Sequence, residues 1–282
     1  VLLSNRIFDS LLFWKYDILF SYFYRYSFFA ALLAKCFGKK TYFTGGIDSL
    51  DSDYASAFNY KIQALFFKLC YWVADSCIIV SQSDLKNIFK VSSLKKKLSY
   101  SEHVINTKLF IADVPKEKIF TSIVWMGDEG NVVRKGVDKA LQIFAELKKI
   151  PEFVDYRFVI IGRKGEGEVL VRSIIDKYNL KGSVELKGEV SEEDKINLLK
   201  QSKYYFQLSL YEGFGLAALE ALCANNIIIH SGKGGLANPI YKEQLLFDID
   251  NDFDSELLKL VNKLACFTPI TSYDNLLEYY DI

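Results

Sequence analysis

The stretch Ser209-Leu-Tyr-Glu-Gly-Phe-Gly-Leu-Ala-Ala-Leu-Glu220 has the pattern of a strand end, a glycine-rich turn and the start of a helix. Gly213 and Gly215 permit positive φ and let a ligand approach the backbone closely, and the free N–H groups of a helix start attract an anion. Two carboxylates, Glu212 in the turn and Glu220 eight residues later, suit the hydroxyl groups of a sugar and of a ribose. The pattern therefore predicts a βα crossover that binds a sugar nucleotide. The alternative is an ordinary βα turn with two unrelated surface glutamates.

On both sides of this stretch, short β-branched or aromatic runs alternate with amphipathic segments. The runs typical of strands are 17–24, 41–44, 76–80, 98–104, 122–126, 157–161, 183–186, 204–209 and 227–230. Strands that alternate with helices form βαβ units and parallel sheets. The sequence thus predicts an α/β fold of two Rossmann-like, doubly wound domains, 1–112 and 113–265, with ligands beyond the carboxyl ends of the strands. Within 266–282, a last helix at about 272–280 is expected to cross back to the N-terminal domain.

The composition is that of a globular protein, with 282 residues of which half are apolar and a quarter charged. The five cysteines form no CxxC pair and the two histidines lie far apart, so we expect no zinc site. The alternating aspartates from Asp248 to Asp254 lack the glycine and the final glutamate of a calcium loop, and are expected to form a solvated loop and a cap for the helix after Asp254. No secretory signal or membrane-spanning stretch is evident, which favours a cytoplasmic protein.

The string Glu-Gly-Phe-Gly-Leu-x-x-Leu-Glu-Ala from Glu212 onward resembles the Glu-x7-Glu signature of retaining family-4 glycosyltransferases, which have the GT-B fold. Further segments that resemble the family are Arg134-Lys135-Gly136-Val137-Asp138, Phe158-Val-Ile-Ile-Gly162, Val184-Glu-Leu-Lys-Gly-Glu-Val190, Ser231-Gly-Lys-Gly-Gly235, Ala74-Asp75, Val80-Ser81 and 107–110. The likeness covers most of residues 16–265 and is strongest in the C-terminal half. It implies a GT-B-like chain whose C-terminal domain binds the donor and whose N-terminal domain faces the acceptor.

The resemblance also implies roles for individual residues. Glu212, Arg134 and Lys135 would act in catalysis, the carboxylate on the sugar hydroxyls and the two cations on the diphosphate, while Glu220 would hold the ribose. The other implied donor contacts are Gly213, Phe214, Gly215, Leu216, Val190 and Gly162. The family route is front-face departure and attack through an oxocarbenium-like state, with retention of configuration. Without a metal, cationic side chains and a helix terminus must stabilise the leaving diphosphate.

These features together predict the partners of the chain. The resemblance implies a nucleotide-diphosphate sugar as the hexose donor, no other cofactor, and a glycan or lipid-linked acceptor in cell-surface polysaccharide synthesis; we expect no nucleic-acid partner. Residues 1–112 carry 14 lysines and arginines against 8 acidic residues, a net +6 that the rest of the chain balances. This charge and the aromatic stretch 11–29 predict peripheral contact with an anionic membrane. The alternative is solvated lysines and buried aromatic residues.

Three departures from the family pattern bear on activity. Asp128 follows Gly127 where the family has arginine. A family acceptor domain has a strand, a glycine-rich loop and further βα units before the strand at 17–24, and no histidine stands near 45–48, where the family has one. The N-terminal domain is therefore expected to be incomplete. These departures favour an alternative, a non-catalytic GT-B remnant or partner subunit that binds a nucleotide sugar, whereas the paired glutamates and cations favour an enzyme.

Overall fold

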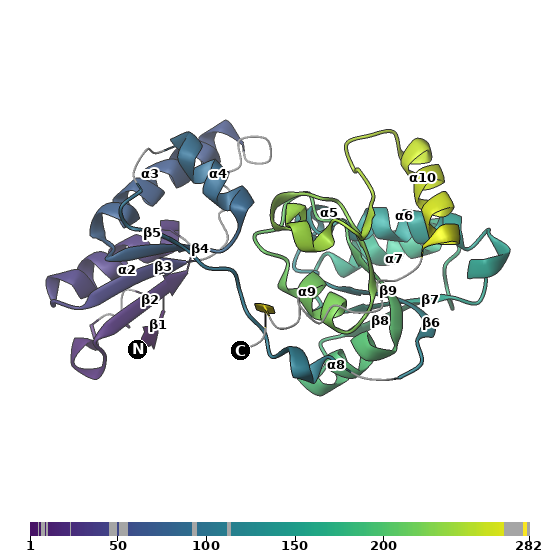
Figure 1. Ribbon diagram of the computed structural model, residues 1–282, viewed down its shortest axis with the longest axis horizontal. Helices are drawn as coiled ribbons and strands as arrows, with labels where there is room; N and C mark the ends of the chain where they lie inside the picture. The colour runs from purple at the N-terminus through teal and green to yellow at the C-terminus, as the bar shows by residue number, and fades with distance from the viewer. Residues whose placement is uncertain are drawn as a thin grey trace. The chain divides into compact units, whose positions relative to one another are not determined.

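The computed structural model describes residues 1–4, 6, 9, 11–22, 24–44, 50, 56–91, 95–111, 114–267 and 279–280. The chain forms two compact units (Figure 1). Unit 1 contains Val1–His103 together with Tyr211–Phe214, and unit 2 contains Val104–Leu210 and Gly215–Ile282. The segment 45–48, and most of the helix expected at 272–280, lie outside the described residues.

Unit 1 is built on a parallel sheet with the strand order β1-β2-β3-β4-β5. Its elements are β1 (Leu2–Leu3), η1 (Phe13–Lys15), β2 (Ile18–Tyr22), α2 (Tyr24–Cys36), β3 (Lys40–Thr44), α3 (Ala57–Val73), β4 (Ser76–Ile79), α4 (Gln82–Val91) and β5 (Leu98–Tyr100). Helices α2 and α3 pack together, with the rings of Phe28 and Phe66 edge to face at 6.1 Å. The sequence pattern does not predict β1, because two residues show no period; the strand is defined by its pairing, Leu2 with Leu19.

Unit 2 contains a second parallel sheet, with the order β11-β10-β9-β6-β7-β8. Its strands are β6 (Glu117–Ile123), β7 (Arg157–Ile161), β8 (Val184–Gly188), β9 (Ser202–Gln207), β10 (Ile227–His230) and β11 (Leu245–Leu246). Its helices are α5 (Glu129–Arg134), α6 (Val137–Leu147), α7 (Glu168–Lys177), α8 (Glu192–Gln201), α9 (Leu216–Cys223) and α10 (Phe253–Cys266), with short 3-10 turns η3 (Thr107–Leu109), η4 (Pro151–Phe153), η5 (Gly234–Ala237) and η6 (Pro239–Tyr241). The strand order reverses between β6 and β9, and ligands of such sheets bind at this switch point.

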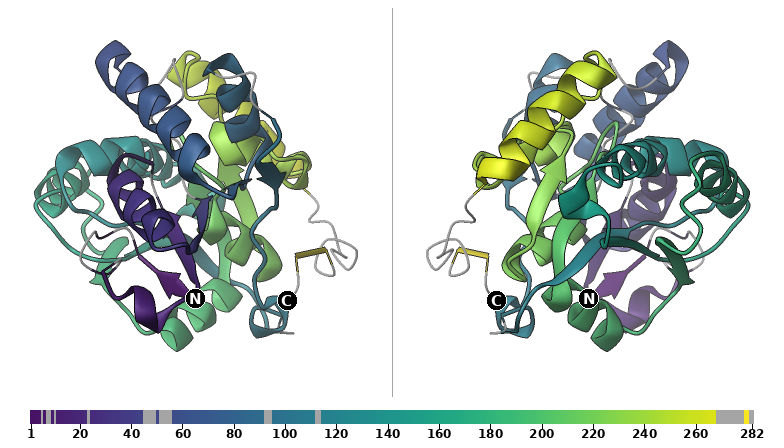
Figure 2. Two further views of the ribbon diagram at one scale, coloured as in Figure 1. Left: turned by 90° about the vertical axis from the view of Figure 1, so that its left-hand side faces the viewer. Right: turned by 90° about the vertical axis from the view of Figure 1, so that its right-hand side faces the viewer.

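Helices cover both faces of the unit 2 sheet, α6, α7 and α10 on one face and α8 and α9 on the other (Figures 1 and 2). Phe120 lies at the centre of the larger core and stacks on Tyr204 and Phe206, with ring centroids 4.6 and 5.1 Å apart. A buried aromatic side chain stabilises the fold by about 2 kcal/mol, and ring pairs add to this. The aromatic residues of the β6 and β9 runs thus fix the central strands that position the site.

One strand prediction for unit 2 is wrong, and one helix of unit 2 was not predicted. The strand expected at 122–126 is β6, which begins at Glu117 and ends at Ile123. The prediction was shifted because the apolar pattern continues past the end of the strand. Val124 and Met126 are buried, and their backbone amides bond to carbonyls at the end of β7 and just after it at 2.9 Å. Helix α5 is absent from the prediction, since six residues that include Gly130 are too few to show a helical period.

The acidic run after β11 forms a loop and a helix cap, as expected, but the helix begins at Phe253 and not after Asp254. Asp252 caps α10, and its carboxylate accepts a hydrogen bond from the Ser255 amide at 2.9 Å. Asp254 lies inside the first turn, where a negative charge favours the helix N-terminus. The amide of Asp248 donates to Glu256 at 3.2 Å, so the loop is also tied to the helix that follows it.

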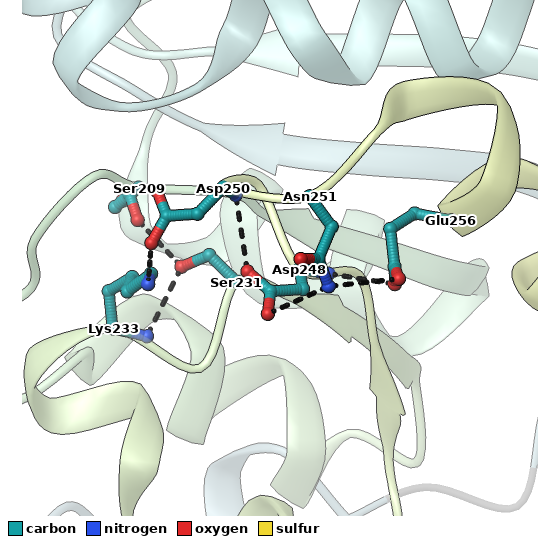
Figure 3. A network of polar contacts seen from close by, with 7 residues as sticks. All are labelled: Ser209, Ser231, Lys233, Asp248, Asp250, Asn251 and Glu256. Carbon is teal, nitrogen blue, oxygen red and sulfur yellow. Dashed lines mark hydrogen bonds and ion pairs between the residues drawn. The ribbon is translucent and has the colours of Figure 1, made fainter.

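Figure 3 shows how the loop after β10 is held. The Ser231 hydroxyl donates to the Ser209 carbonyl at 2.6 Å, and Lys233 forms an ion pair with Asp250. Gly232, between these two residues, has φ +69°, a conformation that favours glycine. These bonds join the loops after β9, β10 and β11, so the carboxyl edge of this half of the sheet is fixed by its own polar groups.

Candidate functional site

The site residues predicted for unit 2 follow the carboxyl ends of its strands. In a parallel sheet all these ends lie at one edge, so the loops after them are neighbours. The loop segments after β6, β7, β8 and β9 carry, in this order, Arg134 with Lys135, Gly162, Val190, and Gly215 with Leu216. The structure therefore brings six of the ten predicted residues to one edge of one sheet.

The basic pair lies in the turn between α5 and α6, against the end of β9. Arg134 is the last residue of α5, and its carbonyl accepts a hydrogen bond from the Leu210 amide at 2.8 Å. Gly136 has φ +68°, and a Cβ atom there would lie 2.0 Å from the Leu208 carbonyl oxygen, so the turn requires glycine. The side chains of Arg134 and Lys135 are half-buried. Two cations thus stand at the switch point between β6 and β9.

Asp128, at the position where the resemblance implies an arginine, caps α5. Its carboxylate accepts a hydrogen bond from the Asn131 amide at 2.6 Å. The Asn131 side-chain oxygen in turn accepts one from the Arg134 guanidinium at 2.7 Å. Asp128 therefore fixes the short helix that orients Arg134, a use that the sequence pattern does not indicate.

The loops after β6, β7 and β8 pack backbone against backbone. Gly162 has φ +131°, its amide donates to the Gly188 carbonyl at 2.8 Å, and a Cβ atom there would lie 2.0 Å from the Val124 carbonyl oxygen. Val190 packs against the buried cluster that includes Leu198 of α8, so part of its side chain serves the core. The loops after β7 and β8 therefore offer a ligand mainly backbone groups.

Gly215 begins α9, the helix predicted from the deciding stretch. It has φ +91°, and its carbonyl accepts a hydrogen bond from the Tyr241 hydroxyl at 3.4 Å. Leu216, the first residue of the helix, is 42% exposed, whereas most of α9 is buried. Glu220 is the one charged residue of this helix and is half-buried. A carboxylate in such surroundings needs a partner.

Lys195 of α8 is that partner. Its Nζ lies 2.8 and 2.9 Å from the two carboxylate oxygens of Glu220, and 2.7 Å from a carboxylate oxygen of Glu192. Burial raises the pKa of Glu220, and Lys195 acts in the opposite direction. Sequence reasoning missed Lys195. The sequence pattern predicts the helix that carries Lys195, but not its contact with Glu220, which is 25 positions away.

Lys116, also missed, joins the two helices that carry this ion pair. Its Nζ donates to the carbonyls of Leu199 at 3.3 Å, of Lys200 at 2.8 Å and of Ala224. These carbonyls lie at the C-terminal ends of α8 and α9, where carbonyls lack helical partners and a positive charge is favoured. Lys116 thus sets the spacing of the two helix ends.

The turn Tyr211–Phe214 belongs to unit 1, so the structure places Glu212, Gly213 and Phe214 there and the other predicted residues in unit 2. Phe214 is buried, and its ring meets the His103 ring edge-on at 5.2 Å. Burial lowers the pKa of His103, which favours the neutral ring. Glu212 and Gly213 are half-buried.

Two further properties concern only the described part of the chain. Among these residues, no group of three or more histidine, cysteine, aspartate or glutamate side chains is arranged to hold a metal ion. No helix among them is both long and apolar enough to cross a bilayer.

Residues 130–264 match the protein family described as Glycosyl transferases group 1. Residues 130–264 are therefore a glycosyltransferase group 1 domain. The match begins in α5 and ends in α10, so it includes the basic pair, the turn with Glu212 and the Glu220 ion pair. The recognition of a family-4-like glycosyltransferase from the sequence is confirmed.

Curated relatives of the group 1 domain are glycosyltransferases. The GDP-mannose:cellobiosyl-diphosphopolyprenol alpha-mannosyltransferase of Xanthomonas oryzae is 32% identical over 163 residues, which are 50% of this chain and 40% of that protein. The phosphatidylinositol N-acetylglucosaminyltransferase GPI3 subunit of Saccharomyces cerevisiae is 27% identical over 129 residues, 46% of this chain and 28% of that protein. The chain thus spans less than half the length of either relative.

Solved structures show the fold of the chain. Anabaena HepE in complex with UDP-glucose has a TM-score of 0.75 at 13% identity, covering 97% of this chain and 77% of that one. Sucrose-phosphate synthase from Thermosynechococcus elongatus has a TM-score of 0.70 at 20% identity, covering 89% and 65%. These neighbours have the GT-B fold, so the predicted GT-B-like α/β fold class is confirmed.

Proposed function

We propose that this chain belongs to a glycosyltransferase that moves a hexose from a nucleotide-diphosphate sugar to a glycan or lipid-linked acceptor. The observation that carries the proposal is the position of Arg134 and Lys135 at the switch point of the unit 2 sheet. The Arg134 carbonyl holds them there by accepting a hydrogen bond from the amide of Leu210, three residues after β9. The family match supports it, as does the name of the Xanthomonas relative, with GDP-mannose and a diphosphopolyprenol-linked sugar.

The two cations act on the leaving group. When the glycosidic bond breaks, negative charge develops on the departing diphosphate, and groups fixed in advance around that charge lower the barrier. Arg134, held by Asn131, can grip two phosphate oxygens, while Lys135 supplies a point charge. The amides of Gly213 to Gly215 add donors at the turn before α9. In this scheme the side chains replace a metal ion, and the donor is the sole small-molecule requirement.

The two glutamates serve different parts of the donor. Glu212 holds the hexose hydroxyls and its charge favours an oxocarbenium-like state, so transfer occurs on the front face with retention. Glu220 holds the ribose hydroxyls, with Lys195 keeping it ionised. Phe214, Leu216, Val190 and Gly162 complete the donor contacts.

The acceptor side is assigned to unit 1. Residues 1–112 carry the net charge of +6, which attracts the chain to an anionic surface. A lipid-linked acceptor would be presented at such a surface. We therefore place the reaction at the cytoplasmic face of a membrane, in the synthesis of a cell-surface polysaccharide.

Calorimetry on the full chain tests donor binding. We expect heat from one of a panel of UDP-, GDP- and ADP-sugars, and the same heat in the presence of EDTA. Loss of the signal on adding EDTA would contradict the metal-free scheme, and no heat with any donor would contradict the proposed function.

Steady-state kinetics on two isosteric variants tests the division of roles. Glu212→Gln removes a charge that matters most in the transition state, so we expect a loss of kcat of about 10²-fold or more with little change in donor KM. Glu220→Gln should mainly raise donor KM, since the ribose contact is alike in both states. The opposite pattern would reverse the assignment.

A non-catalytic remnant that binds a nucleotide sugar is the second candidate. The observation that favours it is Asp128, which stands where the family has arginine and is used as a helix cap. The distinguishing measurement is release of nucleoside diphosphate from a donor that calorimetry shows to bind. Binding without release, over a panel of glycan and lipid-linked acceptors, would favour the remnant.

A further inference from the structure

Helix α3 of unit 1 has an apolar outer face. Phe58, Leu65 and Trp72 are 73%, 55% and 73% exposed. They are seven residues apart, close to two helical turns each, so they line one stripe about 21 Å long. The opposite side of α3 is buried in the core of the unit, with Phe67 and Tyr71 among its residues. A helix that is apolar on both sides is normally covered on both, and an exposed apolar stripe marks an interaction site.

The same stripe carries unbalanced positive charge. Lys61 and Lys68 alternate with the three apolar residues and are exposed. Neither lysine forms an ion pair or hydrogen bond with a residue that the structure describes, and α3 contains no aspartate or glutamate. The outer face therefore combines large apolar side chains with two cations and no anion.

An apolar hollow lies beside the end of the stripe. A cavity of about 370 Å³ between α2 and α3 is lined by Leu32, Lys35, Cys36, Trp72 and Val73. Its walls are mostly apolar, and the Lys35 side chain among them forms an ion pair with Asp75 at 2.6 Å. Such a hollow suits the upper part of an acyl chain.

We propose that this outer face of α3 is a docking surface for an anionic lipid bilayer, on which the helix lies in the plane of the membrane. Aromatic and aliphatic side chains that alternate with lysines are typical of helices at the membrane surface, and tryptophan favours the headgroup level. Each lysine adds attraction to anionic lipid that salt screens. The inference rests on the membrane contact in the proposed function and names the surface that makes it. Donor binding is assigned to other residues, so the docking surface and the donor site can be tested independently.

Vesicle co-sedimentation of the full chain tests the surface. We expect binding to vesicles of phosphatidylcholine with phosphatidylglycerol, weaker binding to phosphatidylcholine alone, and loss of binding at high salt. The double change Lys61→Glu and Lys68→Glu should weaken binding to the anionic vesicles by about thirtyfold or more. The control is the pair of changes Lys177→Glu and Lys181→Glu at exposed lysines of unit 2, which alters the net charge equally and should change binding little. Equal binding by the double variant and the control would overturn the proposal.

Tryptophan fluorescence gives a second readout. In a chain with Trp14→Phe and Trp125→Phe, Trp72 is the remaining tryptophan, and its emission should shift to the blue when anionic vesicles are added. No shift would overturn the proposal. So would a dimer in solution that Trp72→Ser converts to a monomer without reducing vesicle binding, since a second copy would then cover the face. Calorimetry with the donor should be unchanged in each variant, which separates failure of this surface from failure of the proposed function.

Discussion

Helices α3 and α6 each pack an apolar side on a parallel sheet, yet their outer faces differ. On α6 the outer positions include Lys139, Gln142 and Glu146, while its apolar residues are buried. On α3 the outer positions are occupied by aromatic, aliphatic and lysine side chains. Helix α6 therefore exposes no large apolar side chain, whereas α3 exposes a stripe of three. The net charge divides in the same way, +6 in residues 1–112 and −6 in the rest.

The largest effect is expected in the core under α6. Phe144 is fully buried, and its ring lies 5.5 Å from those of Phe120 and Phe158. Phe144→Ala removes these contacts and leaves a cavity, so we expect unit 2 to lose about 3–5 kcal/mol of unfolding free energy. Urea unfolding measures it. A loss below about 1 kcal/mol would mean that α6 is no better covered than α3.

Acid should weaken unit 2 through His230. This ring is buried, neither of its nitrogens has a hydrogen-bond partner among the described residues, and burial lowers its pKa to about 4. An unfolded histidine has a pKa of about 6.5. Between pH 6.5 and pH 4 the histidine is protonated in the unfolded chain and neutral in the folded chain. The free energy of unfolding therefore falls by about 3 kcal/mol as the pH drops from above 6.5 to 4. His230→Phe should remove this slope; an identical slope in the variant would contradict the assignment.

Donor affinity should depend on the polar edge of unit 2. Lys135→Ala removes a charged hydrogen bond to the diphosphate, and we expect donor binding to weaken by about 1.5–3 kcal/mol in calorimetry. Lys181→Ala, at an exposed lysine of the same unit, serves as control and should bind as the parent chain does. If both variants bind alike, Lys135 is an ordinary surface lysine at a helix start.

A smaller, pH-dependent effect is expected at the ion pair. Lys195→Met leaves Glu220 buried beside Glu192, so the pKa of Glu220 rises further. As the pH falls through that pKa, the carboxyl group takes up a proton and loses its capacity to accept two hydroxyl donors. Donor affinity should therefore fall by up to about tenfold on the acid side and little on the alkaline side, measured as Kd against pH. Lys195→Arg keeps the charge and should restore the profile, while a loss equal at all pH values would indicate a purely structural role.

The smallest effect is expected on the stripe of α3. Phe58 is 73% exposed, so Phe58→Ala should change the unfolding free energy of unit 1 by no more than about 0.5 kcal/mol. The difference in lost unfolding free energy between Phe58→Ala and Phe144→Ala measures how differently the two helices are covered. A loss of several kcal/mol would show that the outer face of α3 is already covered within the chain.

Local pattern predicted the elements that have clear borders. The β-branched runs of β7 and β10 were found at their predicted ends, 157–161 and 227–230, because a polar residue or a glycine limits each of them. β6 was shifted because buried loop residues continue its apolar pattern. β1 and α5 were missed because they are too short to show a period.

The candidate site divides along the same line. Arg134 and Lys135 lie in one sequence motif and Glu220 in another, and both motifs are visible in the sequence. Lys195 and Lys116 act across two helices, and their partners are set by how α8 and α9 pack on the sheet. No pattern along the chain records a contact of that kind, so tertiary packing decides these two residues.

The bonds of Lys116 have a consequence for motion. One ammonium group holds the last carbonyls of α8 and the end of α9, so fraying of either helix end breaks bonds that also hold the other. The amide hydrogens in the two final turns should consequently exchange with solvent at linked rates, as a single opening unit. In the parent chain, a nucleotide whose ribose binds to Glu220 on α9 would slow exchange in the last turn of α8 as well.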